Sequence, residues 1–230
     1  MGEGTAGAAA ARVRNLTKTY GEGETRVVAL DDVSLDLMAG EFTAVMGPSG
    51  SGKSTLMHCL AALDTADSGS VMLGDQELTV LKDKALTRLR RDQIGFVFQS
   101  YNLVPTLTAK ENILLPLAIA GRAPDQEWYD AVIATVSLAD RLDHKPNELS
   151  GGQQQRVAVA RALVSRPTVV FADEPTGNLD SATGEHIIDL LFQMNRERGT
   201  TLVLVTHDAE LAKRCDRRIH ISAGAITHED

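Results

Sequence analysis

Residues 47–54 carry the first pattern that could do chemistry, because Gly-Pro-Ser-Gly-Ser-Gly-Lys-Ser fits G-x-x-x-x-G-K-[ST]. An apolar run precedes this loop and a helical pattern follows it, so backbone amides and a helix N-terminus would meet at one place. We expect Lys53 to reach the β- and γ-phosphates of a nucleoside triphosphate and Ser54 to hold Mg²⁺. A glycine-rich turn without a ligand is the alternative, which the strand–loop–helix context disfavours. The candidate phosphate-binding residues are Gly47, Pro48, Ser49, Gly50, Ser51, Gly52, Lys53, Ser54 and Thr55.

Two carboxylates follow a short apolar run at residues 169–172. Asp173 and Glu174 would stand at the polar end of a buried strand. We expect Asp173 to act beside Mg²⁺, because a carboxylate at such a strand end meets the metal edge of the site. Glu174 is placed to polarise a water molecule for attack on the γ-phosphorus. A plain acidic turn is the alternative.

A second helix start with phosphate-binding character lies at residues 149–153, which read Leu-Ser-Gly-Gly-Gln. Ser150 could cap the helix and donate to a γ-phosphate oxygen. Gly151 and Gly152 each cost roughly 1 kcal/mol of helix stability relative to alanine. Close approach of the backbone to a phosphate would explain why glycine occupies both positions, and Gln153 would lie beside that phosphate. Two such helix starts with one catalytic acid predict that a single chain builds only half of each working site. An ordinary capped helix is the alternative.

Three further side chains could serve the same site. Gln99 follows a predicted strand at the entrance to a helical stretch, where its amide could bind Mg²⁺. His207 follows another predicted strand, at the sheet edge where ligands bind in such folds. Tyr20 ends an early strand and could stack on adenine. A structural role is the open alternative for each of the three.

The elements that position these residues follow from the hydrophobic pattern. Short apolar strands alternate with amphipathic helices, which predicts an α/β fold with a parallel sheet covered by helices. Residues 101–142 are mostly helical by pattern and are predicted to form an inserted lobe. The expected strands lie at residues 13–17, 33–37, 42–46, 71–73, 94–98, 168–172 and 201–205, with a final hairpin at 218–221 and 225–228. The expected helices lie at residues 53–63, 82–91, 151–165, 181–198 and 209–215.

The overall composition limits the classes of function. The chain has 230 residues and a formal net charge of −8, which argues against sequence-independent binding of nucleic acid and against a direct anchor on anionic lipid. The longest apolar stretch, residues 113–120, contains Pro116 and is far shorter than the roughly 20 residues of a membrane span. Cys59 and Cys215 lack metal-ligand spacing and are predicted to be buried, reduced thiols. We therefore expect a cytosolic protein whose Gly/Ala-rich residues 1–12 form a disordered tail.

Taken together and in order, these motifs resemble those of the ATP-binding-cassette (ABC) ATPases over nearly the whole chain. The resemblance implies a P-loop NTPase (RecA-like) core with an antiparallel β subdomain and an inserted α-helical subdomain. It implies that Tyr20 stacks on adenine, that Gln99 links the lobe to the site, and that His207 contacts the γ-phosphate. The cofactors would be ATP and Mg²⁺, with ATP held between the glycine loop and the Leu-Ser-Gly-Gly-Gln segment of opposite chains in a head-to-tail homodimer. Asp180 would then lie at the dimer seam.

The resemblance implies that residues 1–230 form one ABC ATPase domain. After the tail, residues 13–99 and 160–230 would form the α/β core with the β subdomain, and residues 100–159 would form the helical subdomain. The residues expected to act in hydrolysis are Lys53, Gln99, Glu174 and His207. The expected Mg²⁺ ligands are Ser54, Gln99 and Asp173.

Residues 96–112 and 173–181 are more narrowly similar to the lipoprotein-releasing and macrolide-export ATPases. That similarity implies an ATP-hydrolysing subunit on the inner face of the cell membrane, bound to a permease with an extracytoplasmic domain and powering export or mechanical work. Leu103, Val104 and Leu107 are candidates for the permease contact, with burial in the lobe as the alternative. A regulatory ATPase of cell division shares these segments and is a second hypothesis. A DNA-repair-type ATPase is a third, although the sustained heptad pattern of a coiled coil is lacking between the motifs.

Overall fold

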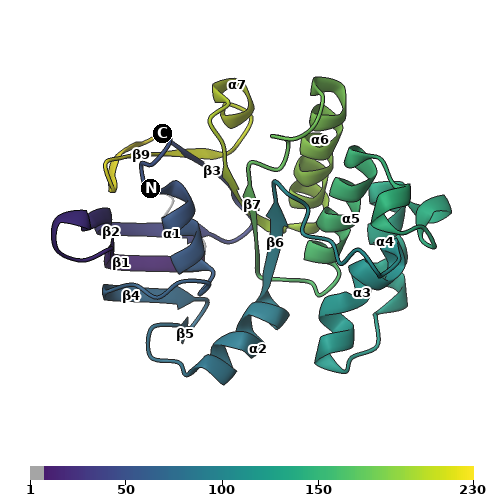
Figure 1. The fold of residues 1–230 in the computed structure, drawn as a ribbon, viewed down its shortest axis with the longest axis horizontal. Helices are drawn as coiled ribbons and strands as arrows, with labels where there is room; N and C mark the ends of the chain where they lie inside the picture. Colours follow the sequence, from purple (N-terminus) through teal and green to yellow (C-terminus); the bar gives the residue numbers. More distant parts are fainter. Residues whose placement is uncertain (1–7) are drawn as a thin grey trace, which may run out of the picture.

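Two β-sheets form the framework of the computed structural model, which describes residues 8–230 (Figure 1). The first sheet is antiparallel and has the strand order β2-β1-β4-β5. The second has the order β10-β9-β3-β8-β7-β6, and all of its strands except β10 run parallel. The strands are β1 (Ala9–Tyr20), β2 (Val27–Met38), β3 (Phe42–Met46), β4 (Ser68–Leu73), β5 (Gln76–Glu77), β6 (Ile94–Phe98), β7 (Val169–Asp173), β8 (Thr201–Val205), β9 (Arg217–Ser222) and β10 (Ala225–Glu229). The predicted α/β fold with an antiparallel β subdomain is confirmed.

The helices gather on different sides of the six-stranded sheet. In Figure 1, α3, α4, α5 and α6 lie together on one side, whereas α1 lies against the antiparallel sheet. The α-helices are α1 (Lys53–Leu60), α2 (Asp83–Gln93), α3 (Ala109–Ala120), α4 (Gln126–Val136), α5 (Gly151–Leu163), α6 (Ser181–Arg198) and α7 (Ala209–Ala212). Single turns of 3₁₀ helix occur at η1 (Gly23–Thr25), η2 (Ala139–Arg141) and η3 (Pro146–Glu148).

The six-stranded sheet separates two hydrophobic cores, because successive side chains along each strand point to opposite faces. On β7, Val170 and Ala172 face the core that contains α5 and α6. Val169 and Phe171 face the other core, which contains α1 and the antiparallel sheet. Helices α1 and α5 therefore pack on opposite faces of the same sheet.

The N-terminal segment corrects one prediction. Residues 1–7 of the expected disordered tail lie outside the described residues, but the expectation is wrong for residues 9–12, which begin β1. Ala11 pairs with Leu37 of β2 and with Leu73 of β4, and it is 1% exposed. This segment is therefore a paired strand with buried alanine side chains, so its Ala-rich composition belongs to the hydrophobic core.

The other predicted elements are present, with shifted ends. Strands β1 and β2 are longer than predicted, α1 already ends at Leu60, and α7 is a single turn. The helical pattern at residues 101–142 corresponds to α3 and α4, and α3 ends at the left-handed Gly121. The boundary expected between residues 159 and 160 falls inside α5, so the helical segment continues into the core without a break.

Candidate active site

The C-terminal ends of four parallel strands lie side by side at one edge of the sheet. Phe98 of β6 pairs with Asp173 of β7, and Asp173 pairs with Val205 of β8. Val205 pairs in turn with Val45 of β3. Parallel pairing therefore brings together segments that are far apart in the sequence. The predicted site residues that follow this row of paired residues are the glycine-rich loop, Gln99, Glu174 and His207.

The glycine-rich loop connects β3 to α1 and is braced by the β9–β10 hairpin. The carbonyl oxygen of Ile221 lies 2.1 Å from the place where a Cβ of Gly47 would stand, so no larger residue fits there. The Gly224 amide donates to the Ser51 carbonyl oxygen over 2.9 Å. Helix α1 begins at Lys53 without a side-chain cap, and the Ser51 hydroxyl is buried with no hydrogen-bond partner among residues 8–230. Unpaired donors concentrate at this helix start, as anion binding requires.

Lys53 lies inside this loop. Its ammonium nitrogen donates to the carbonyl oxygens of Gly47 and Pro48 over 2.8 and 2.7 Å, and the residue is 9% exposed. Lys18 is equally buried, but its ammonium is paired with the carboxylate of Asp64 at 2.9 Å. The partners of Lys53 carry no charge, so its positive charge remains available to an anion that enters the loop.

Asp173 and Ser54 lie within reach of each other at the sheet edge. Burial raises the pKa of the Asp173 carboxyl, while the neighbouring side chains of His58 and Ser54 act in the opposite direction. A carboxylate beside a hydroxyl supplies the hard oxygen ligands that Mg²⁺ prefers, so these residues fit the predicted metal. Gln99 is oriented differently, because its amide nitrogen lies 2.5 Å from the would-be Cβ of Gly177 in the loop after β7.

Glu174 and His207 contact each other. The sequence predicted that both residues serve one site, but not that their side chains meet. His207 Nδ1 lies 3.1 Å from Glu174 Oε1, and the histidine is exposed. The backbone of Glu174 has a φ of 42°, and its amide donates to the Val205 carbonyl oxygen over 3.0 Å. A left-handed non-glycine residue costs roughly 1–3 kcal/mol. This sharp turn at the end of β7 directs the carboxylate towards His207.

Tyr20 lies next to the glycine-rich loop and is held by two residues that the sequence predictions missed. Its hydroxyl donates to Asp64 Oδ2 over 2.7 Å, and the Lys18 ammonium lies 5.0 Å above the ring centroid. Burial raises the pKa of Tyr20, and the hydrogen bond to Asp64 acts in the same direction. Tyr20 is 42% exposed, which leaves room for a base to stack on its ring.

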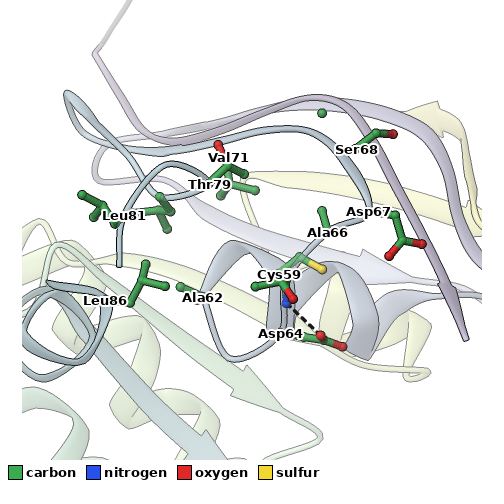
Figure 2. Close-up of a pocket in the computed structure, with 13 residues that line it drawn as sticks. Cys59, Ala62, Asp64, Ala66, Asp67, Ser68, Val71, Thr79, Leu81 and Leu86 are labelled. Carbon is green, nitrogen blue, oxygen red and sulfur yellow. Dashed lines mark hydrogen bonds between the residues drawn. The ribbon is translucent and has the colours of Figure 1, made fainter. Parts of the chain in front are cut away.

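A pocket of about 250 Å³ lies beside Asp64, between the end of α1 and β4 (Figure 2). Cys59, Ala66 and Leu86 line it, and the predicted phosphate-binding and catalytic residues do not. Burial raises the pKa of the Cys59 thiol to about 11 and that of the Cys215 thiol to about 12. Both cysteines are free and buried, as predicted, and their thiols stay protonated at neutral pH.

The Leu-Ser-Gly-Gly-Gln segment begins α5, on the face of the sheet opposite α1. Ser150 Oγ accepts from the Gln153 amide over 3.3 Å, and Gln153 Oε1 accepts from the Ser150 amide over 2.9 Å, which closes a capping box. A Cβ on Gly152 would lie 2.3 Å from Thr183 Cγ2 of α6. Packing of α5 on α6 therefore also favours glycine at this position, beside the approach to phosphate that the sequence predicts for it. Asp180 caps α6 by accepting from the Thr183 amide over 3.0 Å.

Arg161 is a further residue that the sequence predictions missed. Its guanidinium donates to the carbonyl oxygens of Asn102 and Tyr101 over 2.6 and 2.7 Å. Both of these residues are left-handed, with φ values of 50° and 58°, and the Tyr101 hydroxyl lies 3.0 Å from the would-be Cβ of Gly151. Helix α5 therefore contacts the loop that follows Gln99 at two places, through Gly151 at the start of the helix and through Arg161 near its end. The only sequence signal was that asparagine tolerates the left-handed region.

The apolar residues that were predicted to contact a permease are partly buried. Leu103 packs against the core of the helical side, which was the alternative for this residue. The backbone of Val104 is tied to buried Asn112, whose Oδ1 accepts from the Val104 amide over 2.8 Å. Leu107 is also only partly exposed. In addition, every helix in residues 8–230 is too short or too polar to span a bilayer.

Comparison with known proteins gives matches over nearly the whole chain. A family model described as ABC transporter matches residues 30–177. The ABC transporter ATP-binding protein YbbA of Escherichia coli K12 is 50% identical over 219 residues, which cover 94% of this chain and 96% of that protein. The macrolide export ATP-binding/permease protein MacB of Brucella melitensis biotype 1 is 47% identical over 96% of this chain, which spans 34% of that longer protein.

A solved structure extends the likeness to three dimensions. The ATP-binding cassette MJ0796 of Methanocaldococcus jannaschii, a dimer bound to ADP and Pi, has a TM-score of 0.86 at 45% identity, covering 96% of this chain and 97% of that chain. The family model, the relatives and the fold agree with the order of motifs along the chain. The chain therefore belongs to the ABC transporter family, as an ATP-binding subunit with the ATPase activity that powers transport.

Proposed function

We propose that this chain works as a head-to-tail homodimer, in which each ATP is held between the glycine-rich loop of one copy and the Leu-Ser-Gly-Gly-Gln segment of the other. The observation that carries the proposal is the packing of α1 and α5 on opposite faces of one sheet. In one copy the two helix starts therefore lie on opposite sides of the sheet, which favours a phosphate shared between two copies. The dimeric structure of the relative MJ0796 with ADP and Pi supports this arrangement. Asp180, at the start of α6 beside the Leu-Ser-Gly-Gly-Gln segment, would stand at the seam.

The binding roles follow from charge and exposure. Tyr20 would stack on adenine, while residues 47–52 would bind the phosphates with their amides. Lys53 would turn its ammonium from the carbonyl oxygens of the loop to the β- and γ-phosphates. Thr55, one residue into α1, would contact the α-phosphate. The uncancelled charge of Lys53 supports these roles.

Mg²⁺ would be held by Ser54, Asp173 and Gln99. When bound, the ion supplies positive charge to the β- and γ-phosphate oxygens. Burial already raises the pKa of Asp173, so a cation beside this carboxylate would relieve the cost of its charge. Gln99 would have to turn away from Gly177 to reach the metal, which would couple the metal site to the loop that Arg161 holds.

Glu174 would orient the attacking water and accept its proton, and His207 would contact the γ-phosphate. The 3.1 Å contact between Glu174 Oε1 and His207 Nδ1 fixes the position of one side chain relative to the other. Water attack then places its proton on the carboxylate while the bond from the γ-phosphorus to the bridging oxygen breaks. ADP and phosphate would leave as the dimer opens.

Residues 100–159 would act as a helical subdomain that passes this opening and closing to a membrane permease with an extracytoplasmic domain. The chain would then lie on the cytoplasmic face of the membrane, and export would be its direction. The name of the relative MacB joins an ATP-binding part to a permease and to export. The double attachment of the loop after Gln99 to α5 gives the subdomain a rigid connection to the site.

Replacing Glu174 with glutamine tests the catalytic role. Hydrolysis should fall on the order of 10²–10⁴-fold, as for a lost general base, while ATP binding is kept and an ATP-bound dimer accumulates. Phosphate release and size-exclusion chromatography measure the two effects. Glu127→Gln, at an exposed carboxylate of α4, is the matched control and should behave as wild type. Wild-type turnover in Glu174→Gln would remove Glu174 from this role.

A further inference from the structure

A second cluster of chemically active side chains lies on the β9–β10 hairpin, outside the nucleotide site. His220, His228 and Asp230 each offer one ligand atom, and these atoms all lie within 4.8 Å of one another. The imidazole rings of His220 and His228 are stacked, with centroids 3.9 Å apart. His228 and Asp230 are exposed, so the cluster is open to solvent.

A β-bulge brings the three side chains to one face of the hairpin. Pairing shifts by one residue between Ile226 and His228, which makes Thr227 the extra residue. The Thr227 hydroxyl donates to the carbonyl oxygen of His220 over 3.2 Å. Without the bulge, the alternation of side chains would direct His228 away from His220. With it, His228 faces His220 directly, and Asp230 shares that face because it lies two residues farther along.

The separation between His220 and Asp230 suits a shared metal ion better than a hydrogen bond. His220 Nε2 and Asp230 Oδ1 lie 3.4 Å apart, beyond the usual hydrogen-bond limit of about 3.2 Å. Two ligands of a tetrahedral ion with bonds of about 2.0–2.2 Å stand about 3.3–3.6 Å apart. Arg218 donates to the other carboxylate oxygen, Oδ2, over 3.1 and 2.9 Å. It orients the carboxylate as outer-shell partners of metal sites do, and it leaves Oδ1 free.

We propose that His220, His228 and Asp230 bind a divalent transition-metal ion of the Zn²⁺ type, with water as the fourth ligand. Two imidazoles and one carboxylate are a donor set that suits Zn²⁺ and disfavours Mg²⁺ and Ca²⁺. Because the lone pair of an imidazole nitrogen lies in the plane of its ring, exposed His228 would turn out of the stack with His220 to share the ion. The site adjoins the glycine-rich loop, because His220 pairs with Met46, the residue before Gly47. Metal binding would stiffen the hairpin that braces this loop.

Calorimetric titration of ZnCl₂ into the untagged full chain, without nucleotide, tests the proposal. The wild type should bind one Zn²⁺ per chain, and His220→Ala and His228→Ala should each weaken binding at least tenfold. Asp230→Asn should weaken it as well. The matched control is His186→Ala, which removes an exposed histidine of α6 and should bind Zn²⁺ as the wild type does.

Two further measurements keep the test decisive. Co²⁺ in place of Zn²⁺ should give the intense visible absorption of a tetrahedral site, and His228→Ala should lose it. Circular dichroism and thermal unfolding without metal establish that each variant is folded, and His228, as an exposed residue, is the variant that carries the test. Unchanged Zn²⁺ affinity in His228→Ala, or no binding by the wild type, would overturn the site.

Discussion

The starts of α1 and α5 satisfy their backbone donors in different ways. Helix α1 begins at Lys53 without a side-chain cap, whereas Ser150 and Gln153 close a capping box at the start of α5. The first start leaves backbone amides available for the phosphate proposed to bind in the same chain. The second has already satisfied part of its donors, and a helix end adds only about 0.3–2 kcal/mol to anion binding. The start of α5 is therefore suited to a phosphate that another loop has already anchored.

Ser150→Arg changes the start of α5 alone and should have the largest effect of the substitutions that test this comparison. The long cationic side chain removes the capping box and occupies the place proposed for the partner's γ-phosphate. We expect ATP-driven dimerisation and ATP hydrolysis to be abolished, while ATP binding to the single chain is nearly unchanged. Size-exclusion chromatography in the Glu174→Gln background and equilibrium nucleotide binding measure the two properties. Equal loss of both would contradict a site that is divided between two copies.

Gly47, in the loop before α1, and Gly152, in the first turn of α5, should differ in how much stability a substitution by alanine costs. Gly47→Ala would place its Cβ against the backbone carbonyl of Ile221, so we expect a loss of unfolding free energy on the order of 3 kcal/mol or more. Gly152→Ala would meet only the methyl group of Thr183, with an expected loss of about 1–3 kcal/mol. Adding Thr183→Ser removes that methyl and should restore most of the stability of Gly152→Ala. Urea unfolding measures each step, and a failure of Thr183→Ser to rescue would show that approach to the side chain of α6 is not what selects Gly152.

Asp173→Asn tests the metal edge next to α1 and has the smallest expected effect. The pKa of Asp173 is raised by burial, so the folded state binds the proton more tightly than the unfolded state. The contribution of this group to stability is therefore largest at low pH and falls as the pH rises above the ordinary aspartate pKa. The asparagine variant should show a slightly higher Tm than the wild type at pH 7 without nucleotide, and the difference should vanish at low pH. A Tm below that of the wild type at pH 7 would contradict this picture.

The fold and the catalytic edge were predictable because their signals are local. An apolar run that leads into the glycine-rich loop at Gly47, and another that ends in Asp173-Glu174, identify the strand ends, and parallel pairing then brings these ends together. Ser150 and Gln153 carry the spacing of a capping box, so the start of α5 was also predictable.

The contacts that were missed join residues far apart in the sequence. Arg161 holds Tyr101 and Asn102, and Lys18 with Asp64 holds Tyr20, through side chains that are ordinary in their own segments. The strand at residues 9–12 was missed because its Ala-rich composition resembles a flexible linker until the neighbouring strands are known. Both the missed contacts and the missed strand depend on residues that are distant in the sequence, and a local sequence pattern does not reveal those residues.

The brace of the β9–β10 hairpin on the glycine-rich loop has a consequence for biosynthesis. Gly224 and Ile221 contact Ser51 and Gly47, so the phosphate cradle is complete only after the hairpin has been translated and has left the ribosome. A nascent chain that has already exposed residues 47–54 would therefore lack this brace until the last sheet strands dock. The loop would then reach its final shape only after β9 and β10 have emerged, although its own residues are made early.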